Sequence, residues 1–75
     1  MKKATIKKLV EACEANYKSK VTVWGTDEDI FLECRGFTGP SKRVEKMLAD
    51  LGLKITKQTW SCGSDYSGYY YWVAE

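Results

Sequence analysis

The chain has 75 residues, which is enough for one small domain and too few for a second lobe. Hydrophobic residues make up 44% of it and charged residues 29%, a composition that excludes disordered and collagen-like proteins. Lys and Arg number 12 against 10 Asp and Glu, so the net charge of +2 is too small to predict a nucleic-acid or membrane partner from electrostatics alone.

The N-terminal stretch MKKATIKKLV lacks the apolar core of a signal peptide, and no later segment is long enough to cross a bilayer. The three cysteines, Cys13, Cys34 and Cys62, are an odd number without a CxxC pair, which argues against a disulfide framework. These features predict a soluble, cytoplasmic protein in a reducing compartment.

Residues 5–17 carry apolar side chains at intervals of three or four, which predicts a helix with one buried face. These side chains are Ile6, Leu9, Val10, Cys13 and Tyr17. Residues 20–25 and 30–36 are rich in β-branched and aromatic side chains and flank an acidic stretch, so they predict a hairpin.

A second helix is predicted after Gly39, because Pro40 tolerates a first helical position and Ser41 is a natural cap. Its apolar face consists of Val44, Met47, Leu48 and Leu51. Gly52 can adopt the left-handed conformation that ends a helix. Residues 53–60 and 69–74 then predict two more strands.

The order helix, strand, strand, helix, strand, strand predicts a single two-layer α+β domain. Two amphipathic helices in so small a domain should lie on one face of a four-stranded, mainly antiparallel sheet.

Alternation of side chains divides each predicted strand between a core face and an outer face. The predicted core side chains are Val21, Val23, Ile30, Leu32, Cys34, Leu53 and Ile55. The predicted outer side chains are Thr22, Trp24, Phe31, Glu33, Arg35, Thr56, Gln58 and Trp60. In the last strand either Tyr69, Tyr71 and Val73 or Tyr70, Trp72 and Ala74 point inward, and we favour the first set because Trp72 is difficult to fit into a narrow core.

This assignment predicts an aromatic outer face, the candidate binding surface, made of Trp24, Phe31, Trp60, Tyr70 and Trp72. Two interpretations stay open. Cross-strand aromatic pairs stabilise an exposed sheet by about 0.2–1 kcal/mol each, which is a purely structural role. A large uncovered apolar patch also marks interfaces, where Tyr and Trp are enriched.

The sequence offers no catalytic or metal-binding constellation. It contains no histidine, the commonest general base and metal ligand, and the cysteine spacings match no zinc pattern, so we predict neither a metal nor another cofactor. Cys13 and Cys34 fall on predicted core faces. Cys62 is the one thiol expected to be accessible, and a catalytic role for it, with Asp65 or a lysine as its helper, is an alternative without an evident base.

The segments RGFTGPSKRVEKMLADLG and SDYSGYYYWV resemble the large polyvalent protein-associated small domains of phages and other mobile elements. The resemblance rests on Gly39-Pro40, Val44-Glu45 and the tail Asp65-Tyr66-Ser67-Gly68. It implies a phage or plasmid setting, hence the cytoplasm of a host cell, and no catalytic residue.

We therefore expect a non-enzymatic interaction protein, a phage accessory or host-defence inhibitor, that binds a protein partner or a second copy of itself. The binding surface would be the aromatic face or the acidic turn at Asp27, Glu28 and Asp29. The competing hypothesis is a single-strand nucleic-acid binder, in which the rings stack on bases and Lys54 and Lys57 lie near phosphates.

Overall fold

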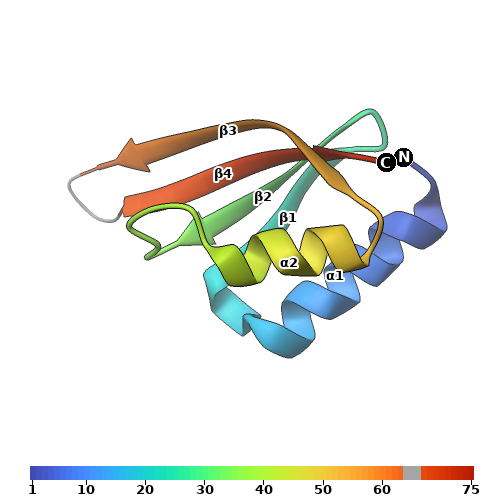
Figure 1. Ribbon diagram of the computed structural model, residues 1–75, viewed down its shortest axis with the longest axis horizontal. Coiled ribbons are helices and arrows are strands. Elements are labelled where there is room, and N and C mark those ends of the chain that lie inside the picture. The colour runs from blue at the N-terminus through green and yellow to red at the C-terminus, as the bar shows by residue number, and fades with distance from the viewer. Residues whose placement is uncertain (64–66) are drawn as a thin grey trace.

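The computed structural model describes residues 1–63 and 67–75. The predicted order of elements is confirmed, with a short 3-10 helix, η1, before the first strand (Figure 1). The elements are α1 (Lys3–Asn16), η1 (Lys18–Lys20), β1 (Val21–Thr26), β2 (Asp29–Arg35), α2 (Lys42–Asp50), β3 (Lys54–Cys62) and β4 (Ser67–Ala74). Among the described residues, no helix combines the length and the apolar character needed to cross a membrane.

The four strands form one sheet in the order β1-β2-β4-β3, and every neighbouring pair is antiparallel. Both helices lie on the same side of this sheet (Figure 1). The predicted two-layer α+β fold is therefore confirmed. The sequence left the strand order open, and the structure shows that β4 lies between β2 and β3, the two strands that α2 connects.

The helices bury the residues that their periodicity predicts, Leu9 and Cys13 from α1 and Val44 and Leu48 from α2. Ser41 caps α2 as expected, since its hydroxyl accepts a hydrogen bond from the Val44 N–H at 3.4 Å. The chain leaves this helix through Gly52, whose φ of 76° lies in the left-handed region.

The core lies between the helices and the sheet, and its largest fully buried side chain is Tyr71 of β4. Val73 is also buried and Tyr69 packs against the core, so the favoured inward set of the last strand is confirmed. The Tyr71 hydroxyl accepts a hydrogen bond from the backbone N–H of Ser41 at 2.8 Å. β4, one of the two inner strands, is thereby attached to the start of α2.

A β-bulge in β3 overturns part of the predicted face assignment. Ile55 pairs with Val73 and Lys57 pairs with Trp72, so Thr56 is an extra residue between two consecutive pairs. Beyond Thr56 the alternation is reversed, and Gln58 lies opposite Tyr71. Trp60 likewise lies opposite Tyr69, on the helix side of the sheet. The prediction that Gln58 and Trp60 belong to the outer face is therefore wrong.

The β1-β2 hairpin is closed by the pair Thr26 and Asp29, which leaves Asp27 and Glu28 as a two-residue turn. Gly25 has a φ of 108°, and a Cβ atom at this position would overlap the carbonyl oxygen of Asp29. Only glycine fits here, because other residues rarely adopt this conformation and the space for a side chain is taken. The amino group of Met1 donates to the carbonyl oxygen of Asp27 at 2.9 Å.

Candidate functional site

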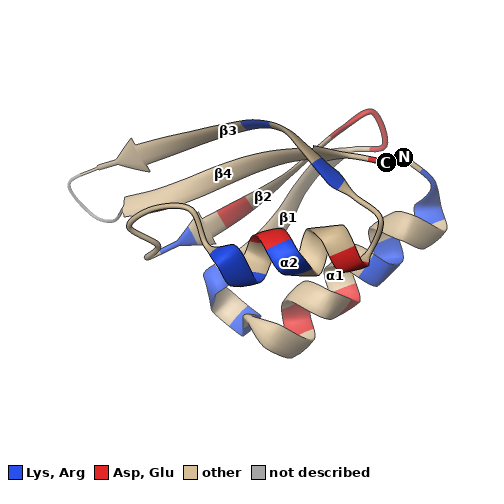
Figure 2. Cartoon of the chain, viewed as in Figure 1, with Lys and Arg blue, Asp and Glu red and all other residues tan. Residues whose placement is uncertain are grey.

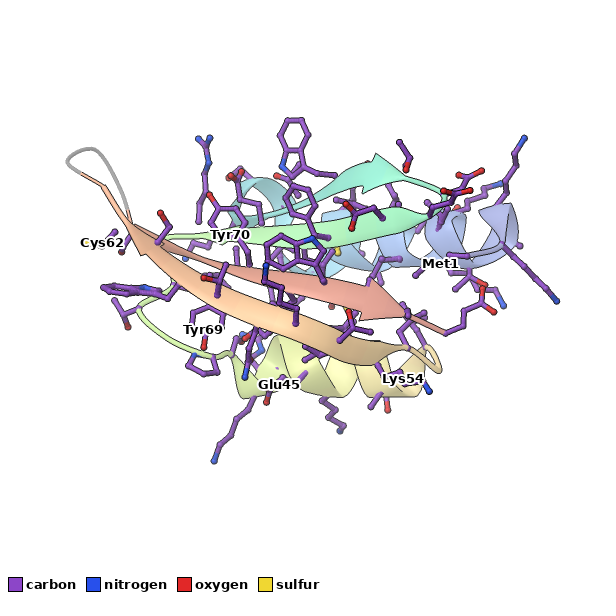
Figure 3. The ribbon with its side chains drawn as sticks, turned by 90° about the horizontal axis from the view of Figure 1, so that it is seen from above. Met1, Glu45, Lys54, Cys62, Tyr69 and Tyr70 are labelled. Atoms are coloured by element: carbon purple, nitrogen blue, oxygen red, sulfur yellow. The ribbon has the colours of Figure 1, made fainter. Side chains whose placement is uncertain are left out.

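The face of the sheet opposite the helices, which is turned toward the viewer in Figure 3, carries one continuous row of predicted site residues. Trp24 of β1 pairs with Phe31 of β2, and Phe31 pairs with Trp72 of β4. Trp72 in turn pairs with Lys57 of β3. Because directly opposed residues share a face, these four side chains stand side by side across all four strands. We call Trp24, Phe31, Trp72 and Lys57 the aromatic row.

Within the aromatic row, Phe31, Trp72 and Lys57 pack against one another. The Phe31 and Trp72 rings are stacked, with centroids 5.3 Å apart and an interplanar angle of 28°. The Lys57 ammonium lies 4.8 Å from the centroid of the Trp72 ring, in the geometry of a cation–π contact. Phe31 belongs to β2 and Lys57 to β3, the two strands that flank β4. Trp72 of β4 is therefore half-buried between them. Trp24, at the end of the row, remains 49% exposed.

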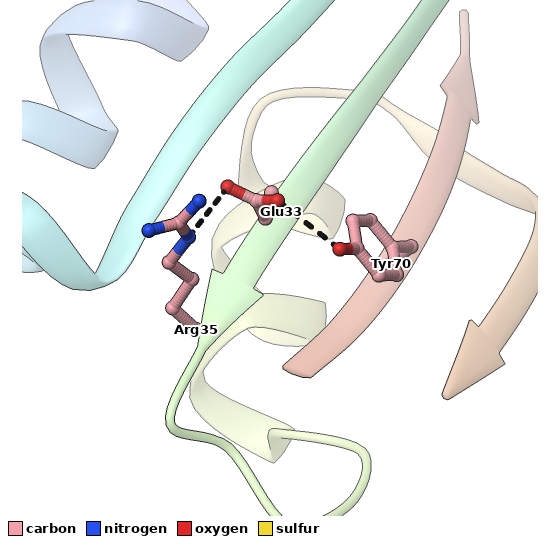
Figure 4. A network of polar contacts seen from close by, with 3 residues as sticks. All are labelled: Glu33, Arg35 and Tyr70. Carbon is pink, nitrogen blue, oxygen red and sulfur yellow. Dashed lines mark hydrogen bonds and ion pairs between the residues drawn. The ribbon is translucent and has the colours of Figure 1, made fainter. Parts of the chain in front are cut away.

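Beside the aromatic row lies a second group of contacting side chains, Glu33, Arg35 and Tyr70, which we call the polar row (Figure 4). It contains a buried carboxylate. Glu33 is only 8% exposed, although it lies on the outer face. Its Oε1 accepts from Arg35 Nε at 3.0 Å, and its Oε2 accepts from the Tyr70 hydroxyl at 3.1 Å. The Tyr70 ring also contacts Phe31, at 6.1 Å between centroids. The carboxylate is therefore satisfied within the surface, which couples the polar row to the aromatic row.

Sequence reasoning placed Glu33 on the outer face but gave it no role. An ion pair between Glu33 and Arg35 could have been predicted, because the two residues are two positions apart in one strand and therefore share a face. What the sequence could not supply was the register that sets Tyr70 directly opposite Glu33.

The remaining predicted binding residues separate into two groups. Lys54 pairs with Ala74, on the same face as Trp72, so both predicted lysines lie on the outer face. Trp60 lies on the other side of the sheet and is 49% exposed, the same fraction as Trp24. The structure thus brings together Trp24, Phe31, Tyr70, Trp72, Lys54 and Lys57 and leaves Trp60 apart.

The three thiols are free and differ in their surroundings. Burial raises the pKa of Cys13 to about 11 and that of Cys34 to about 12, so neither forms a reactive thiolate near neutral pH. Cys62 is exposed at the end of β3, as predicted. Asp65, its predicted helper, lies outside the described residues. Within the described part of the chain, no cluster of three or more His, Cys, Asp or Glu side chains could hold a metal ion.

Charge is distributed unevenly around this face (Figure 2). The acidic residues Asp27, Glu28 and Asp29 are exposed at the tip of the β1-β2 hairpin. Lys54 and Lys57 are exposed on β3, at the opposite edge of the sheet. The aromatic row therefore runs between an acidic corner and a basic edge.

No match to this chain was found in a scan against protein-family models, in a search of curated proteins, or in a search of solved structures.

Proposed function

We propose that the protein is a non-enzymatic interaction module that binds a protein partner through the outer face of its sheet. The observation that carries the proposal is the aromatic row, which spans four strands on the face that neither helix covers. Aromatic side chains on an uncovered surface are the residues that most often dominate binding energy. Trp24 is the anchor of this interface, because half of its surface remains available to a partner.

The packing within the row favours a protein partner over nucleic-acid bases. A base binds by stacking on a free ring face, but Phe31 and Lys57 already contact the Trp72 ring from two sides. Stacking there would require the Phe31 or Lys57 contact to be broken. A protein partner can instead bury the outer edges of the rings without separating them.

Single-stranded nucleic acid is the second candidate, supported by the presence of Lys54 and Lys57 on the same face as the rings. The two candidates differ in their response to salt, because phosphate contacts release counterions. Fluorescence anisotropy of labelled single-stranded DNA and RNA, titrated with the protein at low and high salt, separates them. Salt-sensitive binding with quenching of tryptophan emission would replace the protein-partner proposal with the nucleic-acid one.

The setting that we infer is the cytoplasm of a host cell, with the protein acting as a phage or mobile-element accessory or host-defence inhibitor. The resemblance of its second half to domains of mobile elements supports this setting, and its three free thiols are typical of a reducing compartment. We infer no catalytic activity, and no cofactor or metal is part of the proposal.

The direct test is affinity capture from host lysate, with Trp24→Ser compared against the unaltered protein. We expect the substitution to lower the recovery of the specific partner at least about tenfold, because truncating a hot-spot aromatic costs about 2 kcal/mol or more. The measurement is quantitative mass spectrometry of the captured proteins.

Trp60→Ser is the matched control, since Trp60 has the same exposed fraction as Trp24 and lies on the other side of the sheet. It should leave capture unchanged. Equal losses from both variants, or a loss from Trp60→Ser alone, would contradict binding by the outer face. Circular dichroism of each variant establishes that the fold is retained.

A further inference from the structure

The two edges of the sheet differ in how they are protected against pairing with another strand. β3 carries Lys54 and Lys57 and is interrupted by the bulge at Thr56, and charged side chains and bulges both discourage pairing. β1, with the sequence VTVWGT, contains no charge, no proline and no shift of register. In the described chain no strand pairs with its outer side. β1 is therefore an edge with unused backbone N–H and C=O groups and no device to block their pairing.

A groove runs along this edge between α1 and β1. Its volume is about 250 Å³, and its walls are apolar where Val10 and Cys13 of α1 face Val21 and Val23 of β1. An added strand directs alternate side chains to the helix side of the sheet, where this groove can receive them. The edge thus offers both parts of a strand-addition site, a backbone template and a side-chain pocket.

We propose that a second copy of the chain occupies this edge, with the two β1 strands paired antiparallel about a two-fold axis. The product is a dimer with one continuous eight-stranded sheet, in which the two outer faces become a single surface. This inference goes beyond the proposed function and does not depend on it, because pairing along the β1 backbone requires no partner on the outer face, although Trp24 takes part in both surfaces.

The edge is complementary to itself, which is what a two-fold interface requires. With the axis beside Val23, Thr22 of each copy lies opposite Trp24 of the other, and a β-branched residue opposite an aromatic one is a favourable cross-strand pair. Glu14 and Lys18 also line the groove, so the groove of each copy holds one acidic and one basic group and carries no net charge that would repel a second copy.

The test is sedimentation equilibrium of the full chain over concentrations from micromolar to millimolar. The unaltered protein should approach twice its mass of 8.6 kDa. Thr22→Lys places a protective lysine on the β1 edge and should raise the dimer dissociation constant at least about tenfold. Thr59→Lys is the matched control, because Thr59 lies in the same cross-strand row on the opposite edge of the sheet. A monomer at all concentrations, or dissociation by Thr59→Lys instead, would overturn the proposal.

Amide hydrogen exchange of the unaltered protein gives a second reading that needs no substitution. Alternate backbone amides of β1 should gain protection as the concentration rises, while the edge amides of β3 should not. Protection that increases on β3 and not on β1 would refute pairing at β1. The two proposals can be tested separately. A Thr22→Lys variant that is monomeric but still captures its partner would show that the outer face binds without dimerisation.

Discussion

Tyr71 is the residue that joins the sheet to the second helix, and it shows how one hydroxyl contributes to stability. The ring is fully buried and its oxygen accepts the Ser41 N–H. Tyr71→Phe leaves that donor without its partner, so we expect the free energy of unfolding to fall by about 1–2 kcal/mol in urea titrations. Tyr69→Phe removes a hydroxyl from the same face of β4 at a half-buried position and should cost less than about 0.5 kcal/mol. Equal costs would mean that the bond to Ser41 contributes nothing specific.

The buried thiols make the stability depend on pH in the alkaline range. Burial raises the pKa of Cys13 to about 11 and that of Cys34 to about 12, from 9.0. Below pH 9 both thiols are protonated in the folded and unfolded states, so their contribution to stability is fully present. As pH rises above 9 the unfolded chain loses these protons first, and the free energy of unfolding falls until the folded pKa values are passed.

The slope identifies the groups responsible. We expect unfolding titrations between pH 9 and about 10 to show a loss approaching 1.4 kcal/mol per pH unit for each thiol, because burial also raises the pKa of Tyr71 from 10.0 and this hydroxyl contributes only at higher pH. Cys34→Ala should reduce that slope, although it also lowers stability at neutral pH by opening a cavity. Val44→Ala, which truncates a buried side chain without an ionisable group, should lower stability and leave the slope unchanged. An unaltered slope in Cys34→Ala would contradict this assignment.

At the scale of elements, the β1-β2 hairpin depends on a glycine for two separable reasons. Gly25 and Gly36 both have positive φ, but only at Gly25 would a Cβ atom overlap backbone. Gly36→Ala should therefore cost about 1 kcal/mol from conformation alone, and Gly25→Ala should cost more than about 2 kcal/mol. Thermal or urea unfolding of the two variants measures the difference. A smaller loss from Gly25→Ala than from Gly36→Ala would show that the hairpin adjusts around the added methyl group.

Local sequence signals predicted the elements well because each signal acts over a few residues. The cap at Ser41, the helix end at Gly52 and the acidic turn after Gly25 each depend on neighbouring residues, and the structure has all three. The β-bulge had no comparable signal. An extra residue in a strand depends on how the strand meets its partner, so strict alternation continued through Thr56 and placed Trp60 on the wrong face.

The sequence predicted which residues belong to the candidate site better than it predicted how those residues are arranged. Phe31 and Trp72 were assigned to the outer face from parity, which each strand supplies by itself. That they stack, and that Lys57 lies over Trp72, depends on β4 lying between β2 and β3. Strand order is set by packing over the whole molecule, which neither periodicity nor turn residues encode.

At the scale of the whole molecule, the two faces of the sheet differ in their role. The helix side holds the buried core, while the outer side holds the aromatic row and the Glu33 network. A change on the outer face at an exposed position should therefore alter association and leave stability nearly constant. The Trp24→Ser variant rests on this separation, and its unfolding midpoint should stay close to that of the unaltered protein.

The position of β4 also bears on the order in which the protein folds. Residues of β1 and β2 are close in the sequence, as are those of β3 and β4, so each hairpin closes a short loop. The pairs Phe31 with Trp72 and Leu32 with Tyr71 join the two hairpins across about half of the chain, and closing that long loop costs more conformational entropy. We therefore expect the pairing of β2 with β4 to be the slow step of folding, and substitutions at the β2-β4 contact should change the folding rate more than those in either turn, as stopped-flow refolding would measure.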